Sequence, residues 1–201
     1  MTSGRATLGH LSREERARQR AAMAASTPLT PMRALGIATL ASGALLAGAH
    51  AFERFGGLAP CALCLEQREV HWAALTVAGV MLFFARAGAA KVVAAGLGAL
   101  CVVYLFSTGL AAYHAGVEWG FWKGPSGCAA TGLGDGPSVG DLLSGLDAPG
   151  PRGPACSEAA WRLGGVSMAG YNVLASASLA AVCLLACVAF ARRLYARPLA
   201  A

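Results

Sequence analysis

The stretch that decides the fold is residues 61–85, "CALCLEQREVHWAALTVAGVMLFFA", in which a cysteine pair and a polar turn run directly into an apolar segment. The apolar part alone, residues 70–85, would make a helix only about 24 Å long, which is short of the roughly 30 Å hydrocarbon core of a membrane. A helix that begins near Cys61 is about 37 Å long and crosses the core with moderate tilt. The sequence therefore predicts a membrane-spanning helix whose first turn carries Cys61 and Cys64.

Three further apolar segments point to the same class of protein. Of the 201 residues, 56% are hydrophobic and 13% are charged, about half the charged share of a soluble domain. The segments lack the alternating pattern of barrel strands, so helices are the structure that satisfies their backbone in lipid. We expect an all-α membrane protein, a four-transmembrane-helix bundle with a long periplasmic loop between helices 3 and 4. The expected helices are about 32–52, 61–85, 92–113 and 166–191, and the expected outer loops are 53–60 and 114–165.

Basic residues are distributed unevenly between the connecting segments. Eleven of the 16 Lys and Arg residues lie in residues 1–33, 86–91 and 192–201, whereas eight of the ten acidic residues lie in residues 50–69 and 114–165. By the positive-inside rule, both termini and the short middle connector face the cytoplasm. We therefore expect a basic cytoplasmic extension at 1–31 and a cytoplasmic tail at 194–201. The net charge of +6 follows from this bias, so it does not indicate nucleic-acid binding.

The seven cysteines divide into two groups by location. Three lie inside apolar segments, where cysteine packs as a small hydrophobic side chain: Cys101, Cys183 and Cys187. The other four lie on the outer side, two at the start of the expected helix 61–85 and two in the second outer loop, where an oxidising compartment favours disulfides: Cys61, Cys64, Cys128 and Cys156. Three interpretations of these four remain open, namely two structural disulfides, a four-cysteine zinc site, and a redox relay between two disulfides.

Arg68 favours the redox interpretation. On a helix that begins near Cys61, the side chains of Cys61, Cys64, Arg68 and His71 share one face. The positive end of the helix dipole and the guanidinium both stabilise a thiolate on this face. A structural disulfide needs no such arginine, although Arg68 could also extend to the lipid headgroups. A zinc site split across a Gly- and Pro-rich loop would be poorly preorganised, so no metal is expected.

Three motifs resemble one known family. They are "PCALCLEQR" from Pro60, "YHAGVEWGFWKGPSGC" ending at Cys128, and "CSEAAWRLGGVSMAGYN" from Cys156. With the four-helix topology, residues 32–193 resemble the bacterial disulfide bond formation protein B (DsbB) family. One departure is Gln67, where some members of the family carry Glu.

The resemblance implies a thiol:quinone oxidoreductase of the bacterial inner membrane. It implies a periplasmic thioredoxin-fold dithiol oxidase (DsbA-like) as the partner, and ubiquinone or another quinone of the membrane pool as the electron acceptor. Cys128 and Cys156 would receive electrons from the partner, and Cys156 would attack Cys61 and free Cys64 as the thiolate that faces the quinone. The implied catalytic residues are therefore these four cysteines.

The resemblance implies that Arg68 and His114 border the quinone. The alternative for His114 is an interfacial histidine in an aromatic belt with Trp119 and Trp122. We expect Arg68, and not His71, to serve the acceptor. Tyr171 and Asn172 are expected to form hydrogen bonds between helices.

Two other functions stay open at this point. The chain could be a non-catalytic membrane scaffold whose disulfides are structural, or a specialised paralogue that serves one dedicated partner.

Overall fold

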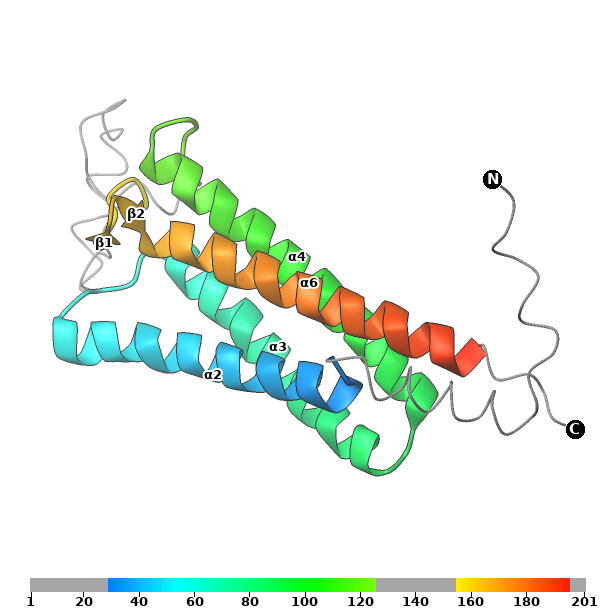
Figure 1. Ribbon diagram of the computed structural model, residues 1–201. Helices are drawn as coiled ribbons and strands as arrows, with labels where there is room; N and C mark the ends of the chain where they lie inside the picture. The colour runs from blue at the N-terminus through cyan, green and yellow to red at the C-terminus, as the bar shows by residue number, and fades with distance from the viewer. Residues whose placement is uncertain (1–28, 126–154, 196–201) are drawn as a thin grey trace, which may run out of the picture.

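The computed structural model describes residues 29–125 and 155–195, and within these ranges the chain forms four long helices and a small hairpin (Figure 1). The helices are α2 (Pro31–Gly56), α3 (Ala62–Arg86), α4 (Ala90–Glu118) and α6 (Met168–Tyr195). The hairpin pairs β1 (Arg162–Leu163) with β2 (Val166–Ser167) in antiparallel register, with Arg162 opposite Ser167. All four helices are long and apolar enough to cross a membrane, which confirms the predicted helical class.

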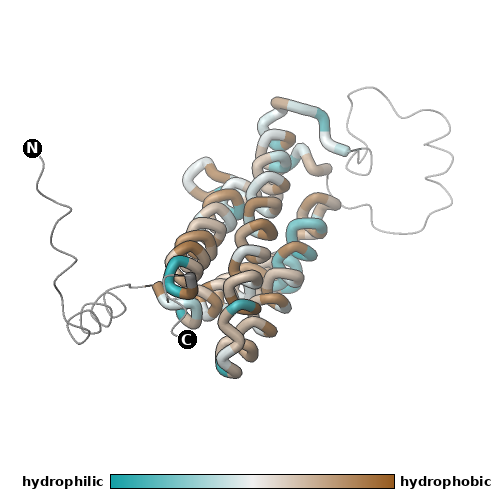
Figure 2. Tube along the Cα trace, turned by 90° about the vertical axis from the view of Figure 1, so that its right-hand side faces the viewer, coloured by the Kyte–Doolittle hydropathy of each residue, from teal (hydrophilic) through white to brown (hydrophobic). Residues whose placement is uncertain are grey.

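The helices give the bundle two chemically different ends. Figure 1 shows α4 and α6 side by side along their lengths, and these two helices share the most extensive contact of the bundle. The end of α2, the start of α3, the end of α4 and the hairpin lie together at what we call the cysteine end. The start of α2, the turn between α3 and α4 and the end of α6 lie at the opposite end, which we call the basic end. Figure 2 shows apolar residues along the helices and polar residues mainly near their ends.

Local sequence signals fix where α2 and α3 begin and end. At the start of α2, Pro31 occupies the first turn and the Thr30 hydroxyl accepts a hydrogen bond from the Arg33 backbone N–H at 3.3 Å. The helix ends at Gly57, whose φ of 66° is the left-handed conformation that glycine adopts at helix ends. Cys61 caps α3, because its sulfur accepts from the Cys64 backbone N–H at 3.2 Å. The cap and the candidate thiol are thus the same residue.

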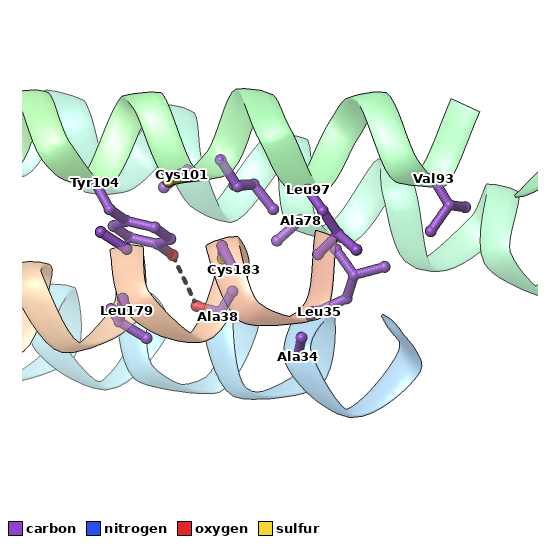
Figure 3. Close-up of a cluster of buried hydrophobic side chains, with 14 residues drawn as sticks. Ala34, Leu35, Ala38, Ala78, Val93, Leu97, Cys101, Tyr104, Leu179 and Cys183 are labelled. Atoms are coloured by element: carbon purple, nitrogen blue, oxygen red, sulfur yellow. Dashed lines mark hydrogen bonds between the residues drawn. The ribbon is translucent and has the colours of Figure 1, made fainter. Parts of the chain in front are cut away.

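The core is a cluster of buried side chains from all four helices, toward the basic end (Figure 3). Small residues such as Ala38 and Ala78 are fully buried there beside Leu97 and Tyr104. The Tyr104 hydroxyl lies 3.3 Å from the Ala38 carbonyl oxygen, the contact drawn in Figure 3. Gly96 leaves room for the Met81 side chain between α3 and α4, because a Cβ there would lie 2.1 Å from the Met81 sulfur and that side chain would have to move.

The structure differs from the expected boundaries at the cysteine end. Helix α2 continues to Gly56, beyond the expected end at residue 52, and α4 continues to Glu118, beyond the expected end at residue 113. The expected outer loops therefore begin later, because charged residues at a membrane surface do not stop a helix. The hairpin was not predicted, since its strands are two residues long. The N-terminal extension, the middle of the long loop and the last residues of the tail lie outside the described residues.

Candidate functional site

A cavity of about 330 Å³ opens at the cysteine end of the bundle, and we call it the cysteine pocket. Its walls are mostly apolar and come from all four helices and the segment around the hairpin. Apolar side chains on these walls include Leu45, Leu46, Phe52, Leu58, Trp161 and Met168. The polar groups on its walls are few, and they include Cys61, Cys64, Arg68 and His114. The pocket therefore brings together Cys61, Cys64, Arg68 and His114, whereas Cys156, the other described residue that the sequence proposed, does not line it.

Cys61 and Cys64 are in contact at the start of α3. Their sulfur atoms lie 2.7 Å apart, and both thiols are free in this structure. Cys61 is 4% exposed, while Cys64 is half-buried and faces the pocket. The contact with Cys64 and burial raise the pKa of the Cys61 thiol, which precedes the apolar span of α3. The first turn of the helix thus places the two sulfurs where a disulfide can form between them, with Cys64 on the accessible side.

Cys156 comes from the distant loop and lies against Cys61. It is fully buried in a small cluster with Cys61, Leu63 and Val117. The ligand atoms of Cys61, Cys156 and His114 all lie within 4.8 Å of one another. Cys156 is disulfide-bonded, and its sulfur therefore offers no thiolate to a metal ion. The arrangement suits exchange between two disulfides, and Cys128 lies outside the described residues.

Arg68 reaches across the pocket to α2. Its Nη1 donates to Glu53 Oε2 at 2.5 Å, and its Nη2 donates to the Ala49 carbonyl oxygen at 3.1 Å. Glu53 is the partner that the sequence analysis missed, because that residue was expected in a loop. The extra turn of α2 puts Glu53 in reach of Arg68. The guanidinium is therefore fixed beside the pocket that Cys64 also lines.

His114 points into the bundle and away from the aromatic belt. It is 3% exposed, and its Nε2 lies 3.6 Å from the Cys61 sulfur and 3.7 Å from Glu118 Oε1. The aromatic neighbours face elsewhere, since Trp122 stacks on Tyr113 and donates to the Tyr113 carbonyl oxygen at 2.8 Å. The alternative interpretation of His114 as a belt residue is therefore not what the structure shows.

A chain of buried side-chain hydrogen bonds continues from His114 through the bundle. His114 Nδ1 lies 2.8 Å from Gln67 Nε2, and Gln67 Oε1 accepts from Asn172 Nδ2 at 2.7 Å. Asn172 Oδ1 in turn lies 2.9 Å from His71 Nε2, and His71 Nδ1 lies 3.4 Å from the Ser42 hydroxyl. These contacts confirm the prediction that Asn172 bonds between helices. They also link α4, α3, α6 and α2 at one level of the bundle.

Tyr171 has a different partner from the one expected. Its hydroxyl donates to the Leu163 carbonyl oxygen at 3.1 Å, so it ties α6 to β1 and not to another helix. The Tyr171 ring also lies 6.1 Å from Trp161 by ring centroids, and both line the cysteine pocket. Tyr171 thus holds the hairpin against one wall of the pocket.

The family model for the disulfide bond formation protein DsbB matches residues 31–186, which is most of the chain. The chain therefore belongs to the DsbB family, whose members act in disulfide bond formation. The match and the four helices that could cross a membrane identify a multi-pass membrane protein. No curated protein and no solved structure matches the chain.

Proposed function

We propose that this protein is a thiol:quinone oxidoreductase that reoxidises a periplasmic thioredoxin-fold dithiol oxidase and passes the electrons to a membrane quinone. One observation carries the proposal. The disulfide-bonded Cys156 lies against Cys61, while Cys64, the partner of Cys61, lines an apolar pocket. Two cysteine pairs in series therefore connect a loop with a cavity that is lined mostly by apolar side chains.

The thiol steps follow from thiolate attack on a disulfide. A thiolate of the partner would attack Cys128, break the Cys128–Cys156 bond and release Cys156 as a thiolate. Cys156 would then attack Cys61, which breaks the Cys61–Cys64 bond and leaves the electron pair on Cys64. The contact within 4.8 Å between the Cys61 and Cys156 groups supports this direction of attack.

The cysteine pocket fits the head group of a quinone. A quinone ring offers two flat apolar faces and two carbonyl oxygens, so it suits an apolar cavity that holds a few hydrogen-bond donors. The pocket has apolar walls and places Arg68 and His114 among its polar groups. A bound quinone would supply the capacity to accept two electrons and two protons.

Arg68 is the residue best placed to serve that acceptor. It is a permanent cation whose planar group can donate to an oxygen and attract the Cys64 thiolate. Glu53 and the Ala49 carbonyl oxygen hold it on the pocket wall. His71 also lines the pocket, but its ring nitrogens contact Asn172 and Ser42. This difference favours Arg68 over His71, as the sequence analysis expected.

The charges at the two ends of the bundle support the proposed orientation. Arg33, Arg86, Lys91, Arg192 and Arg193 lie at the basic end, at the ends of α2, α3, α4 and α6. The acidic residues of the described helices lie at the cysteine end. By the positive-inside rule, the basic end and both termini would face the cytoplasm of a bacterial cell, and the cysteine pocket would face the periplasm.

Purified protein in detergent tests the proposal. Mixed with a reduced thioredoxin-fold dithiol and ubiquinone, it should oxidise the dithiol and form quinol, and Cys64→Ser should abolish both. The matched control is Cys187→Ser, because Cys187 is a free thiol on α6 outside the pocket. If the unaltered protein formed no quinol, the proposed oxidoreductase function would be refuted. The function as a non-catalytic membrane scaffold would then remain. Oxidation of one dithiol partner alone among several would identify the specialised paralogue.

A further inference from the structure

The two ring nitrogens of His114 have partners of different chemistry. Nδ1 faces the Gln67 side-chain nitrogen at 2.8 Å, and Nε2 faces the Cys61 sulfur at 3.6 Å and Glu118 Oε1 at 3.7 Å. In a neutral imidazole one nitrogen carries the proton and the other accepts a hydrogen bond. The hydrogen bond at one ring nitrogen therefore decides whether the other ring nitrogen donates or accepts a hydrogen bond.

The surroundings of Gln67 fix the direction of its amide. Gln67 Nε2 also lies 3.2 Å from the Leu63 carbonyl oxygen, which can only accept a hydrogen bond. On the other side of the amide, Oε1 lies 2.7 Å from Asn172 Nδ2. A reversed amide would place its oxygen against the Leu63 oxygen. The Gln67 nitrogen is therefore the group that faces His114.

The orientation of Asn172 supports the same assignment. Its Oδ1 accepts from the Ser176 hydroxyl at 3.2 Å and lies 2.9 Å from His71 Nε2. With Oδ1 committed to these donors, the Asn172 nitrogen is the atom that faces Gln67. All of these side chains come from α3 and α6 and are buried or half-buried. The direction of donation therefore passes consistently from Asn172 to Gln67 to His114.

We propose that Gln67 is a positioning residue that fixes the His114 proton on Nε2, where it donates to the Cys61 sulfur when that sulfur is the leaving group. The inference rests on the proposed function. In the steps that restore the loop disulfide, the second thiolate of the partner attacks the mixed disulfide, closes the partner's own disulfide and releases Cys128 as a thiolate. Cys128 then attacks Cys156, the Cys156–Cys61 bond breaks, and its electron pair goes to the Cys61 sulfur. Cys61 is 4% exposed, so water reaches it poorly and a buried donor has to stabilise its charge.

Glu118 and the backbone of Cys156 give the His114 imidazole further hydrogen-bond acceptors. The Glu118 side chain is 3% exposed, and its other oxygen, Oε2, has no hydrogen-bond partner among the described residues. A disulfide sulfur is a weak acceptor, so the His114 N–H is expected to face Glu118 while Cys61 is bonded and to turn to Cys61 when it becomes a thiolate. The charged and titratable groups around His114 are thus Glu118 on its own helix and Cys61, Cys64 and Cys156 from the facing segments.

Nitrogen-15 NMR of histidine-labelled protein in detergent tests the assignment, with His114→Gln to identify the signals of His114. We expect a protonated Nε2 and an unprotonated Nδ1 in the unaltered protein. Gln67→Met removes the donor at similar volume and should give a mixture of both tautomers. Gln67→Glu supplies an acceptor and should move the proton to Nδ1. A protonated Nδ1 in the unaltered protein would overturn the proposal even if every variant failed to fold.

The turnover number kcat distinguishes a positioning role of Gln67 from a role in packing alone. Loss of a hydrogen bond to a charged group should lower kcat for Gln67→Met by about tenfold or more, with the KM for the dithiol unchanged. Cys187→Ala is the control, because it removes the hydrogen bond between α6 and α4 from the Cys187 thiol to the Ala94 carbonyl oxygen at 3.3 Å, which lies outside the hydrogen-bonded chain to His114. It should keep the His114 tautomer and kcat. An unchanged kcat in Gln67→Met would overturn the role of Gln67, whereas an inactive unaltered protein would instead refute the proposed function.

Discussion

At the residue scale, the pairing of Arg68 with Glu53 holds a cation on the wall of the cysteine pocket. The position of Arg68 on the cysteine face of α3 follows from helical spacing alone. Its pairing with Glu53 spans 15 positions and depends on how α2 packs beside α3. The same limit applies to Gln67 and Asn172, which are 105 positions apart. Spacing along one helix is therefore predictable, but hydrogen bonds between helices are not.

Substitution of Arg68 and Glu53 should have unequal effects on quinone affinity. Arg68→Gln removes a charged donor from the pocket wall and should raise the KM for quinone roughly tenfold or more. Glu53→Gln removes a partner that is 41% exposed, and such pairs contribute little, so the KM should change less than about fivefold. Steady-state kinetics with ubiquinone measure both.

The control for this pair is Glu66→Gln, which changes an exposed carboxylate of α3 that does not line the pocket. Its KM for quinone should match that of the unaltered protein. If Arg68→Gln also left the KM unchanged, Arg68 would have no part in binding the acceptor.

At the element scale, Cys61 serves α3 in two ways, as the N-cap where the helix begins and as a thiol of the cysteine pair. The helix-length argument predicted that α3 begins beside the cysteine pair, and the observed start at Ala62 confirms it. The length of a membrane helix is a strong constraint because the hydrocarbon core has a fixed thickness. The short hairpin before α6 had no comparable signal, since two-residue strands show no periodicity.

The cap and the thiol of Cys61 can be separated by mutation. Cys61→Ser and Cys61→Ala should both abolish dithiol oxidation, because neither can form the disulfide with Cys64. The serine hydroxyl can still accept the Cys64 N–H, whereas alanine cannot, so only Cys61→Ala should lose about 1 kcal/mol of stability. Thermal unfolding in detergent measures the difference. Equal stability of the two variants would show that the Cys61 cap contributes nothing to α3.

At the scale of the whole molecule, the two ends of the bundle predict the direction of insertion. Five of the seven basic residues on the described helices lie at the basic end, and the acidic residues of these helices and the cysteine pocket lie at the other end. The apolar segments and the uneven distribution of charge could be predicted from the sequence, because both depend only on which residue type stands at each position. The shape of the pocket could not be predicted from the sequence, because its walls come from all four helices and the hairpin region together.

Reporter fusions in a bacterial host test this orientation. A periplasm-dependent reporter such as alkaline phosphatase should be inactive when fused after residue 195 and active when inserted within residues 129–155. Replacement of Arg86 and Lys91 with Gln removes two positive charges from the connector between α3 and α4. This change should reduce the difference in reporter activity between the two fusion sites. An active reporter at the C-terminal fusion would place the cysteine pocket on the cytoplasmic side and contradict the proposed orientation.

The proposed relay depends above all on direct disulfide exchange between Cys156 and Cys61. Disulfide mapping by mass spectrometry in a Cys64→Ser variant tests it most directly, because Cys61 then has no partner in its own turn. We predict exchange in which the Cys61–Cys156 bond forms, the Cys128–Cys156 bond breaks and Cys128 becomes a free thiol. If Cys61 stayed fully reactive toward an alkylating agent and Cys156 stayed bonded to Cys128, the two pairs would not communicate and the relay would be wrong.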